Sequence, residues 1–310
     1  INGSGGKVTM KLTDIMKKRT MFSFEVFPPK TDEAMVKLGK TLEHLYEFKP
    51  DYISCTYGAG GSNVGRNLEV CKKIKEADND TIPVTHFTCV GNTKEGVKEQ
   101  LQNYLDKGID HVLTLRGDLP YGWTGTNGDF AYATDLLAFV RKEFGSQFEI
   151  AVSGSPEGHI TCGTLEADIA HLKQKQDEGA DYIMTQLTYD MEQFKYWFDA
   201  IRKAGITLPV DVGVMPVINK DSVLNMCLSR NGSAIPRNLA EIFSHHWFDK
   251  DPDGNPLPEV KAAFKEEGIN YTVNQLHEYM ALGVDGIHLY AMNTWKNSTE
   301  ILKRAGIHTI

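Results

Sequence analysis

The chain has 310 residues, of which 41% are hydrophobic and 24% are charged, as is ordinary for a soluble globular protein. Its formal net charge is −8 and it has no basic block, so we expect neither nucleic acid nor an anionic membrane as its partner. No run of about 18 apolar residues occurs, and therefore no membrane span is predicted.

The first ten residues, INGSGGKVTM, are small, polar and rich in glycine. We interpret residues 1–10 as a cloning remnant ahead of a native start near Met10, and we expect no signal peptide. The five cysteines form no C-x-x-C pair, and their odd number argues against a disulfide framework. Reduced thiols and a cytoplasmic location are therefore expected. His86 and Cys89 lack a further ligand pair, so no metal site is predicted.

Short apolar, β-branched runs recur along the whole chain and predict eight strands. They span residues 21–27, 51–57, 83–89, 111–117, 149–155, 181–187, 209–215 and 286–292. Amphipathic stretches between them predict helices, as at 31–48, 93–108 and 164–180, where a threonine stands at the expected N-cap. The long last interval predicts two or more helices, one of them over 238–248, and a polar loop over 249–260.

Eight strands that alternate with helices predict an α/β fold, a single-domain (β/α)₈ TIM barrel over residues 11–310. A doubly wound parallel sheet is the alternative. It has less support, because no G-x-G-x-x-G follows the first strand.

The carboxyl ends of barrel strands carry the active site in this fold, and polar residues stand at nearly every predicted strand end. They are Glu25, Thr56, Tyr57, His86, Arg116, Gly117, Asp118, Ser155, Glu157, His159, Gln186, Tyr290 and Asn293. Ordinary solvation of strand ends is the alternative interpretation of this set. The Gly-rich segment 56–62 could hold a phosphate with its backbone N–H groups, or could be a plain turn.

Glu25 fits simple solvation least well, because it lies in the aromatic run MFSFEVFPPK. Desolvation by Phe24 and Phe27 is expected to raise the pKa of its carboxyl group, which suits a general acid. We expect Pro28 and Pro29 to hold the strand end stiffly.

At this point the sequence resembles the 5,10-methylenetetrahydrofolate reductase family. The motifs that carry the resemblance occur in the family's order over about residues 20 to 295. They are FSFEVFPPKT, TYGAGG, THFTCVG, LRGD, MTQLTYD and HLYAMN. The resemblance implies an FAD-containing barrel that reduces 5,10-methylenetetrahydrofolate to 5-methyltetrahydrofolate by ping-pong hydride transfer. The flavin would be reduced by NADH, by NADPH or by a partner-protein donor.

The resemblance also implies residue roles. Glu25 matches the general acid that supplies a proton toward N10 of the folate, and Asp118 matches an aspartate near flavin and pterin. Gln186 matches a glutamine that contacts pterin and nicotinamide, and Tyr290 an aromatic residue near the folate. The positions that match FAD contacts are Thr56, Tyr57, Ala59, His86, Arg116, Gly117, Asp118, Tyr132, Ala133, His159, Asp168 and Lys175. Arg116 and Lys175 are suited to the pyrophosphate.

Three positions depart from the family pattern, namely Ser155, Gln174 and Thr294. Lys296, Arg230 and Arg237 are candidates for the glutamate tail of the folate. We expect no S-adenosylmethionine regulatory domain and no feedback by that ligand. A homo-oligomer is expected, with an electron-donating partner subunit as one option. A non-redox pterin-binding barrel, such as a methyltransferase or a folate-binding subunit, is the alternative function.

Overall fold

The computed structural model describes residues 10–57, 64–77, 80–229, 232–246 and 250–307. Within these residues, eight parallel strands close into a barrel in chain order, and the TIM-barrel prediction is confirmed. The strands are β1 Met21–Val26, β2 Tyr52–Cys55, β3 Ile82–Thr88, β4 His111–Leu115, β5 Glu149–Gly154, β6 Tyr182–Thr185, β7 Val210–Val214 and β8 Gly286–Tyr290. Each lies inside a predicted strand or differs from it by one residue.

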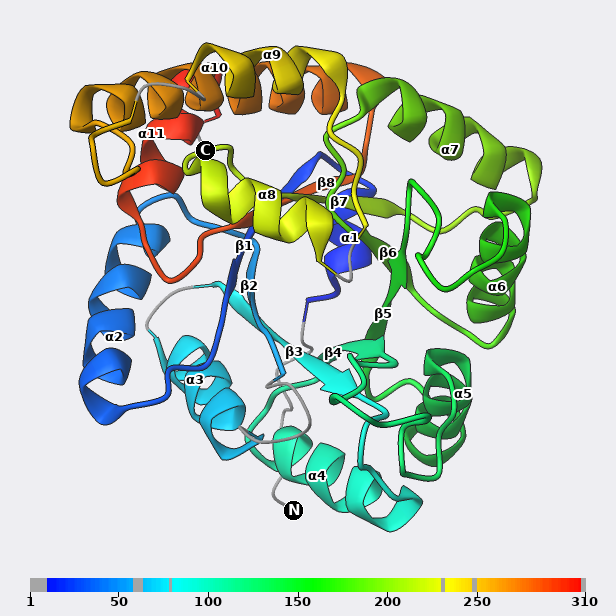
Figure 1. Ribbon diagram of the computed structural model, residues 1–310. Coiled ribbons are helices and arrows are strands. Elements are labelled where there is room, and N and C mark those ends of the chain that lie inside the picture. The colour runs from blue at the N-terminus through cyan, green and yellow to red at the C-terminus, as the bar shows by residue number, and fades with distance from the viewer. Residues whose placement is uncertain (1–9, 58–63, 78–79, 230–231, 247–249, 308–310) are drawn as a thin grey trace.

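Most of the helices form a ring around the barrel, whereas α8 Lys220–Leu228 is drawn inside that ring (Figure 1). They are α2 Asp32–Tyr46, α3 Val64–Glu76, α4 Lys94–Asp106, α5 Ala133–Phe144, α6 Leu165–Asp177, α7 Met191–Lys203, α8 Lys220–Leu228, α9 Arg237–His245, α10 Pro258–Leu282 and α11 Lys296–Ala305. The prediction of several helices after β7 is confirmed. The predicted loop 249–260 is wrong at its end, because α10 already begins at Pro258, and a proline suits the first helical position.

A short additional helix, α1 Leu12–Met16, closes the amino-terminal end of the barrel. Leu12 and Met16 pack with Met21, Tyr52 and Tyr182 in a buried cluster inside that end. A larger apolar layer lies between the strands and the outer helices. Because the amino-terminal end is plugged, a ligand site inside the barrel has to open at the carboxyl ends of the strands.

The pairing of β1 fixes which side chains surround Glu25. Glu25 is in register with Ser54 on β2 and with Tyr290 on β8. Side chains of a strand alternate between its two faces, so Phe24 packs outward in the apolar layer while Ser23 and Glu25 share the other face. None of the helices described is both long and apolar enough to span a bilayer.

Candidate active site

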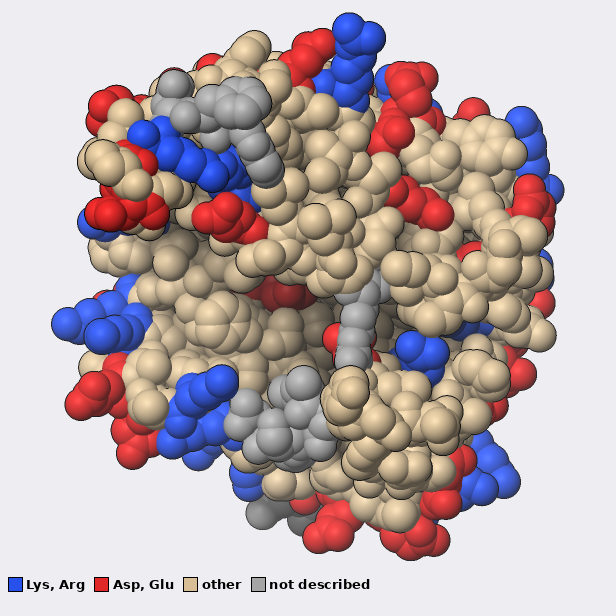
Figure 2. Space-filling view, in the orientation of Figure 1, with Lys and Arg blue, Asp and Glu red and all other residues tan. Residues whose placement is uncertain are grey.

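A cavity of about 370 Å³ opens at the carboxyl ends of the strands. This volume lies within the usual range for small-molecule and cofactor sites. The space-filling view shows this face hollowed near its centre, with acidic atoms visible inside (Figure 2). Most of the predicted site residues described by the structure line this cavity: Thr56, Tyr57, His86, Arg116, Gly117, Asp118, Ala133, His159, Asp168, Lys175 and Gln186.

A few predicted site residues lie elsewhere. Tyr132 precedes α5 as its N-cap residue and is 66% exposed, outside the residues that line the cavity. Ala59 and Arg230 fall outside the described residues. Arg237 pairs with Glu241 on the surface, and Lys296 lies over the ring of Trp295, so neither lines the cavity.

Two cationic side chains stand on one side of the cavity. Lys175, on α6, donates a hydrogen bond to the carbonyl oxygen of Ser153 at 2.8 Å. Burial lowers the pKa of Lys175, and the neighbouring Asp168 partly opposes that shift. Arg116 follows β4, and its described hydrogen bond is a long 3.5 Å contact to the Gly117 carbonyl oxygen. The guanidinium therefore retains most of its donors for a ligand.

His159 offers one defined donor to the same region. Its Nδ1 accepts a hydrogen bond from the backbone N–H of Thr161 at 3.3 Å. Burial lowers the pKa of His159, with nearby Arg116 acting in the same direction. The ring is therefore neutral near pH 7, and its proton lies on Nε2.

Gly117 is required by the backbone at the cavity wall. Its φ is +84°, and a Cβ there would lie 2.9 Å from Cβ of Thr88. Any other residue would be strained and would push β3 and the β4 loop apart. Glycine at this position therefore allows the β4 loop to pack closely against Thr88 and Val90.

Glu25 lies beside the cavity between two imidazole rings. Its Oε2 is 3.5 Å from Nε2 of His86 and 3.4 Å from Nε2 of His288. Burial raises the pKa of Glu25, but the hydrogen bond with His288 and the positive potentials of both rings outweigh burial and lower the pKa overall. The expectation of a raised pKa is wrong, because Phe24 packs in the outer apolar layer and the two imidazole rings oppose the effect of burial.

His86 and His288 differ in their surroundings. Burial lowers the pKa of His86 to about 4, and its Nε2 has no hydrogen-bond partner among the described residues. His288 is fully buried and makes hydrogen bonds through both nitrogens. Its Nδ1 is 2.7 Å from Oγ of Ser23, and its Nε2 is 3.0 Å from Oγ of Ser54.

Sequence reasoning missed His288, Ser23 and Ser54. The alternation of a strand could have identified two of them, since Ser23 stands two residues before Glu25, and His288 two residues before Tyr290. Ser54 could be identified only from the register between β1 and β2, which no local sequence pattern gives.

Asn293 holds the backbone that follows Glu25. Its side-chain oxygen accepts from the N–H of Phe27, and its side-chain nitrogen donates to the Phe27 carbonyl oxygen, both at 2.9 Å. The Ala291 N–H also donates to the Glu25 carbonyl oxygen at 3.0 Å. The strand end is thus held by β8 and its loop, in addition to any stiffness from Pro28 and Pro29.

Tyr290 is half-buried next to Glu25 and its ring meets that of His288 edge-on, with centroids 5.9 Å apart. Gly213 on β7 makes room for it, because a Cβ there would lie 2.5 Å from the Tyr290 hydroxyl. Tyr290 is therefore a neighbour of the acid group that does not itself line the cavity.

Glu157 has a structural role in the cavity wall. Its two oxygens accept hydrogen bonds from the Thr188 hydroxyl and the Ala234 N–H, both at 2.6 Å. It therefore ties the β5 loop to the β6 loop and to the segment before α9. Ser155 lines the cavity beside it.

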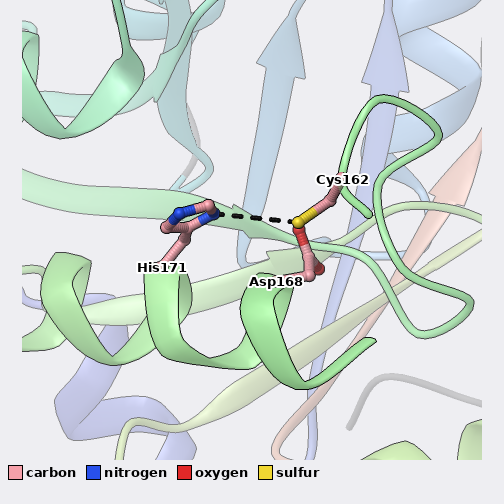
Figure 3. A group of neighbouring side chains, drawn as sticks. All are labelled: Cys162, Asp168 and His171. Atoms are coloured by element: carbon pink, nitrogen blue, oxygen red, sulfur yellow. Dashed lines mark hydrogen bonds between the residues drawn. The ribbon is translucent and has the colours of Figure 1, made fainter. Parts of the chain in front are cut away.

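Cys162, Asp168 and His171 gather at the start of α6 (Figure 3). Their ligand atoms lie within 4.8 Å of one another, and these donor types can hold zinc. Asp168 also lines the cavity, where burial raises its pKa, and the resemblance gives it to the flavin. We therefore treat it as part of the cavity wall.

A family model described as methylenetetrahydrofolate reductase matches residues 10–306. The 5,10-methylenetetrahydrofolate reductase of Escherichia coli is 30% identical over 286 residues, which cover 92% of this chain and 90% of that protein. The chain belongs to the methylenetetrahydrofolate reductase family.

Other relatives are longer. Methylenetetrahydrofolate reductase (NADH) 1 of Arabidopsis thaliana is 32% identical over 97% of this chain, and the chain spans about half the length of that relative. Among solved structures, an uncharacterized protein from Clostridium thermocellum that binds two copies of 5-methyl-5,6,7,8-tetrahydrofolic acid has a TM-score of 0.61. That likeness, at 13% identity over 96% of this chain, concerns the fold.

Proposed function

We propose that this methylenetetrahydrofolate reductase family member reduces 5,10-methylenetetrahydrofolate to 5-methyltetrahydrofolate with FAD as its cofactor. The observation that carries the proposal is Glu25 held between His86 and His288 beside a cavity with Arg116 and Lys175 on its wall. The non-redox pterin-binding barrel remains the alternative.

The residues present fit a flavin dinucleotide. Arg116 and Lys175 would hold the pyrophosphate, and Nε2–H of His159 would donate to the same group or to the ribose. His86 and Gly117 line the same cavity and would form part of its wall around the flavin. Bound there, the flavin supplies hydride transfer.

Gln186 and Asp118 position the reactants. The Gln186 amide can both donate and accept, which suits a pterin and a nicotinamide that take turns in one place. Asp118 is exposed at the cavity wall, where its negative charge favours a cationic iminium on the folate N5.

Glu25 supplies the proton toward N10 that opens the five-membered ring. Near neutral pH its lowered pKa leaves the carboxylate ionised, so it has to gain a proton before it acts. The Glu25 side chain is 19% exposed. Folate binding removes that remaining water, which raises its pKa, and His288 at 3.4 Å is the nearest proton source.

The proposal is tested by the visible spectrum and by anaerobic mixing. Purified protein should bind FAD, and the visible absorbance of the bound flavin should fall when NADH, NADPH or reduced ferredoxin is added. Methylenetetrahydrofolate should then restore the spectrum of the oxidised flavin. NADH is the first donor to test, because the plant relatives are named for it. Protein that cannot be reconstituted with FAD, yet binds the folate, would favour the non-redox alternative.

Steady-state kinetics test the shared position at Gln186. Parallel initial-rate lines are expected, since donor and folate occupy the same place in turn, whereas intersecting lines would argue against it. Gln186→Glu should impair both half-reactions, because a carboxylate no longer donates. The homo-oligomer, the partner subunit and the cytoplasmic location remain predictions.

A further inference from the structure

A buried pair of polar side chains lies near the starts of β2 and β7, closer to the amino-terminal end of the barrel than Glu25. Tyr52 on β2 and Asp211 on β7 are both fully buried, and the Tyr52 hydroxyl donates to Oδ2 of Asp211 at 2.6 Å. Neither residue contacts the cavity, and the chemistry proposed above uses neither of them.

Tyr52 connects this pair to the acid group. Its ring stacks on the ring of His288, with centroids 5.0 Å apart and planes 16° from parallel. His288 in turn is 3.4 Å from Glu25. A continuous column therefore leads from Asp211 through Tyr52 and His288 to the Glu25 carboxyl group.

Stability does not explain a carboxyl group at position 211. Its Oδ1 has no hydrogen-bond partner among the described residues. Gly286 leaves the space for this oxygen, since a Cβ there would lie 2.6 Å from it. A half-satisfied buried carboxylate is costly, and an apolar residue of similar size would pack there without that penalty.

Asp211 carries charge at neutral pH all the same. Burial raises its pKa to about 6, while His288 and the hydrogen bond from Tyr52 oppose burial. The titratable and charged groups that act on Asp211 or His288 come from five strands and two strand starts: Glu25, Tyr52, His86, Tyr182, Tyr290, Asp51 and Asp285. Among these groups, His288 is the base whose ring stacks on Tyr52, the hydrogen-bond donor to Asp211.

We propose that Asp211 and Tyr52 are positioning residues that hold His288 in its protonated form, so that His288 can reprotonate Glu25. This inference rests on the proposed function of Glu25. In each turnover the Glu25 carboxylate first takes the Nε2 proton of His288 and then gives that proton to N10. The imidazole becomes neutral and regains a proton from solvent once the product leaves, so protons balance.

The charge of His288 in the resting protein tests the proposal directly. ¹⁵N-histidine NMR at pH 7 reports the fraction of imidazolium, and a His288→Gln variant assigns the signal among the ten histidines. Asp211→Asn keeps the shape and removes the charge, and should lower the imidazolium-to-imidazole ratio of His288 about tenfold. Tyr52→Phe keeps the stacked ring but removes the donor, and should shift the ratio in the same direction.

Tyr182→Phe is the matched control. Tyr182 is a buried phenol in the same cluster, with no hydrogen-bond partner for its hydroxyl among the described residues. Its loss should leave the His288 signal unchanged. A His288 signal that is unchanged in Asp211→Asn and Tyr52→Phe as well would overturn the proposal.

The NMR measurement needs neither flavin nor folate, so its outcome is independent of the proposed reaction. In stopped-flow, Asp211→Asn should slow folate reduction and move the alkaline limb of its pH profile to lower pH, with folate affinity retained. A shifted NMR signal without any folate reductase activity in the unmodified protein would instead contradict the proposed function alone.

Discussion

Within the described part of the chain, a cluster of histidine and carboxylate lies at each end of the barrel. The upper cluster is Glu25 with His86 and His288, beside the cavity. The lower cluster is His111 with Asp110 and Glu149, at the plugged end. His111 Nδ1 is 2.7 Å from Asp110 and its Nε2 is 3.0 Å from Glu149. The residue types are the same, but the ratio of imidazole to carboxylate is inverted.

The lower cluster fixes structure. Glu149 accepts hydrogen bonds from the N–H of Leu12, the N–H of Thr13 and the Thr13 hydroxyl, at 2.6, 3.1 and 2.5 Å, and so anchors α1. Burial lowers the pKa of His111, but hydrogen bonds to its two carboxylates outweigh burial and raise it overall. Burial likewise raises the pKa of Glu149, and its partners lower it overall.

The upper cluster has a single carboxylate, Glu25, between His86 and His288. Burial lowers the pKa of His86 to about 4, whereas the two carboxylates beside His111 raise its pKa. Two imidazole rings lie beside one carboxylate, so a proton can move between the Glu25 carboxylate and either ring. The difference teaches that an excess of acids locks a histidine in place, whereas an excess of histidines beside a cavity leaves a carboxylate ready to exchange a proton.

The largest expected effect is the loss of folate reduction when Glu25 of the upper cluster is replaced. Glu25→Gln keeps the shape but cannot give up a proton, and general acid catalysis typically contributes roughly 10²–10⁴-fold. Folate reduction in stopped-flow should fall by that order, while flavin reduction by the donor, which needs no acid, should persist. Normal folate reduction, or equal loss of both half-reactions, would make Glu25 a structural residue.

The second effect belongs to the lower cluster. Glu149→Gln removes one partner of a buried ion pair and weakens the anchor of α1, which should cost about 3 kcal/mol of unfolding free energy. Urea denaturation measures this loss, and both half-reactions should keep their rates. The exposed pair of Glu143 with Lys98 provides the control, since Glu143→Gln should leave stability within error. A rate loss without a stability loss in Glu149→Gln would break the comparison.

The fold and much of the cavity wall followed from the sequence. Strand periodicity marked all eight strands, the motifs LRGD and MTQLTYD placed Arg116 and Gln186 at strand ends, and the family resemblance assigned Lys175 to the cofactor site. Both depend on local patterns. Periodicity is read within one segment, and the barrel rule then brings all strand ends to one side.

The surroundings of Glu25 could not be predicted in the same way. The effect of His288 on its pKa depends on the closure of β1 against β8, which are 265 residues apart in sequence at the Ser23–His288 contact. The aromatic neighbours that suggested a raised pKa are adjacent in sequence, but Phe24 faces the outer layer. The residues adjacent to Glu25 in sequence thus predicted a pKa shift in the wrong direction, whereas the strand register that brings His288 beside Glu25 accounts for the lowered pKa.

The third prediction uses pH, because His86 and His111 have pKa shifts of opposite sign. The pKa of His86 is about 4 in the folded protein and has its ordinary value of 6.5 in the unfolded chain, so the unfolded chain binds more protons between these two values. Stability should fall by roughly 3 kcal/mol from this group as the pH drops from 6.5 to 4. In His86→Gln this part of the slope should vanish, as measured by urea denaturation across that range.

His111→Gln is the matched variant for the opposite sign. The raised pKa of folded His111 means that its contribution is fully present below pH 6.5 and is lost as the pH rises through the folded value. His111→Gln should therefore reduce the loss of unfolding free energy as the pH rises above 6.5. The loss of unfolding free energy between pH 6.5 and 4, which comes from His86, should remain. The same slope change in both variants would show that the two clusters do not differ electrostatically.

The smallest effect concerns Asp118, an acid at the cavity wall that belongs to neither cluster. It is exposed, so water screens its charge far more than that of Glu25 or Glu149. Asp118→Asn removes a negative charge that opposes an anionic reduced flavin, and should raise the flavin reduction potential by about 20 mV, equivalent to roughly 1 kcal/mol for two electrons. Folate reduction should slow at the same time, because the cationic iminium loses a stabilising partner. Equilibrium titration against a reference dye measures the flavin reduction potential.

Raising the ionic strength should shrink the difference in potential between the Asp118→Asn variant and the unmodified protein, because salt screens an exposed charge. A potential that stays the same or falls in the variant would show that Asp118 acts through packing or hydrogen bonding and not through its charge.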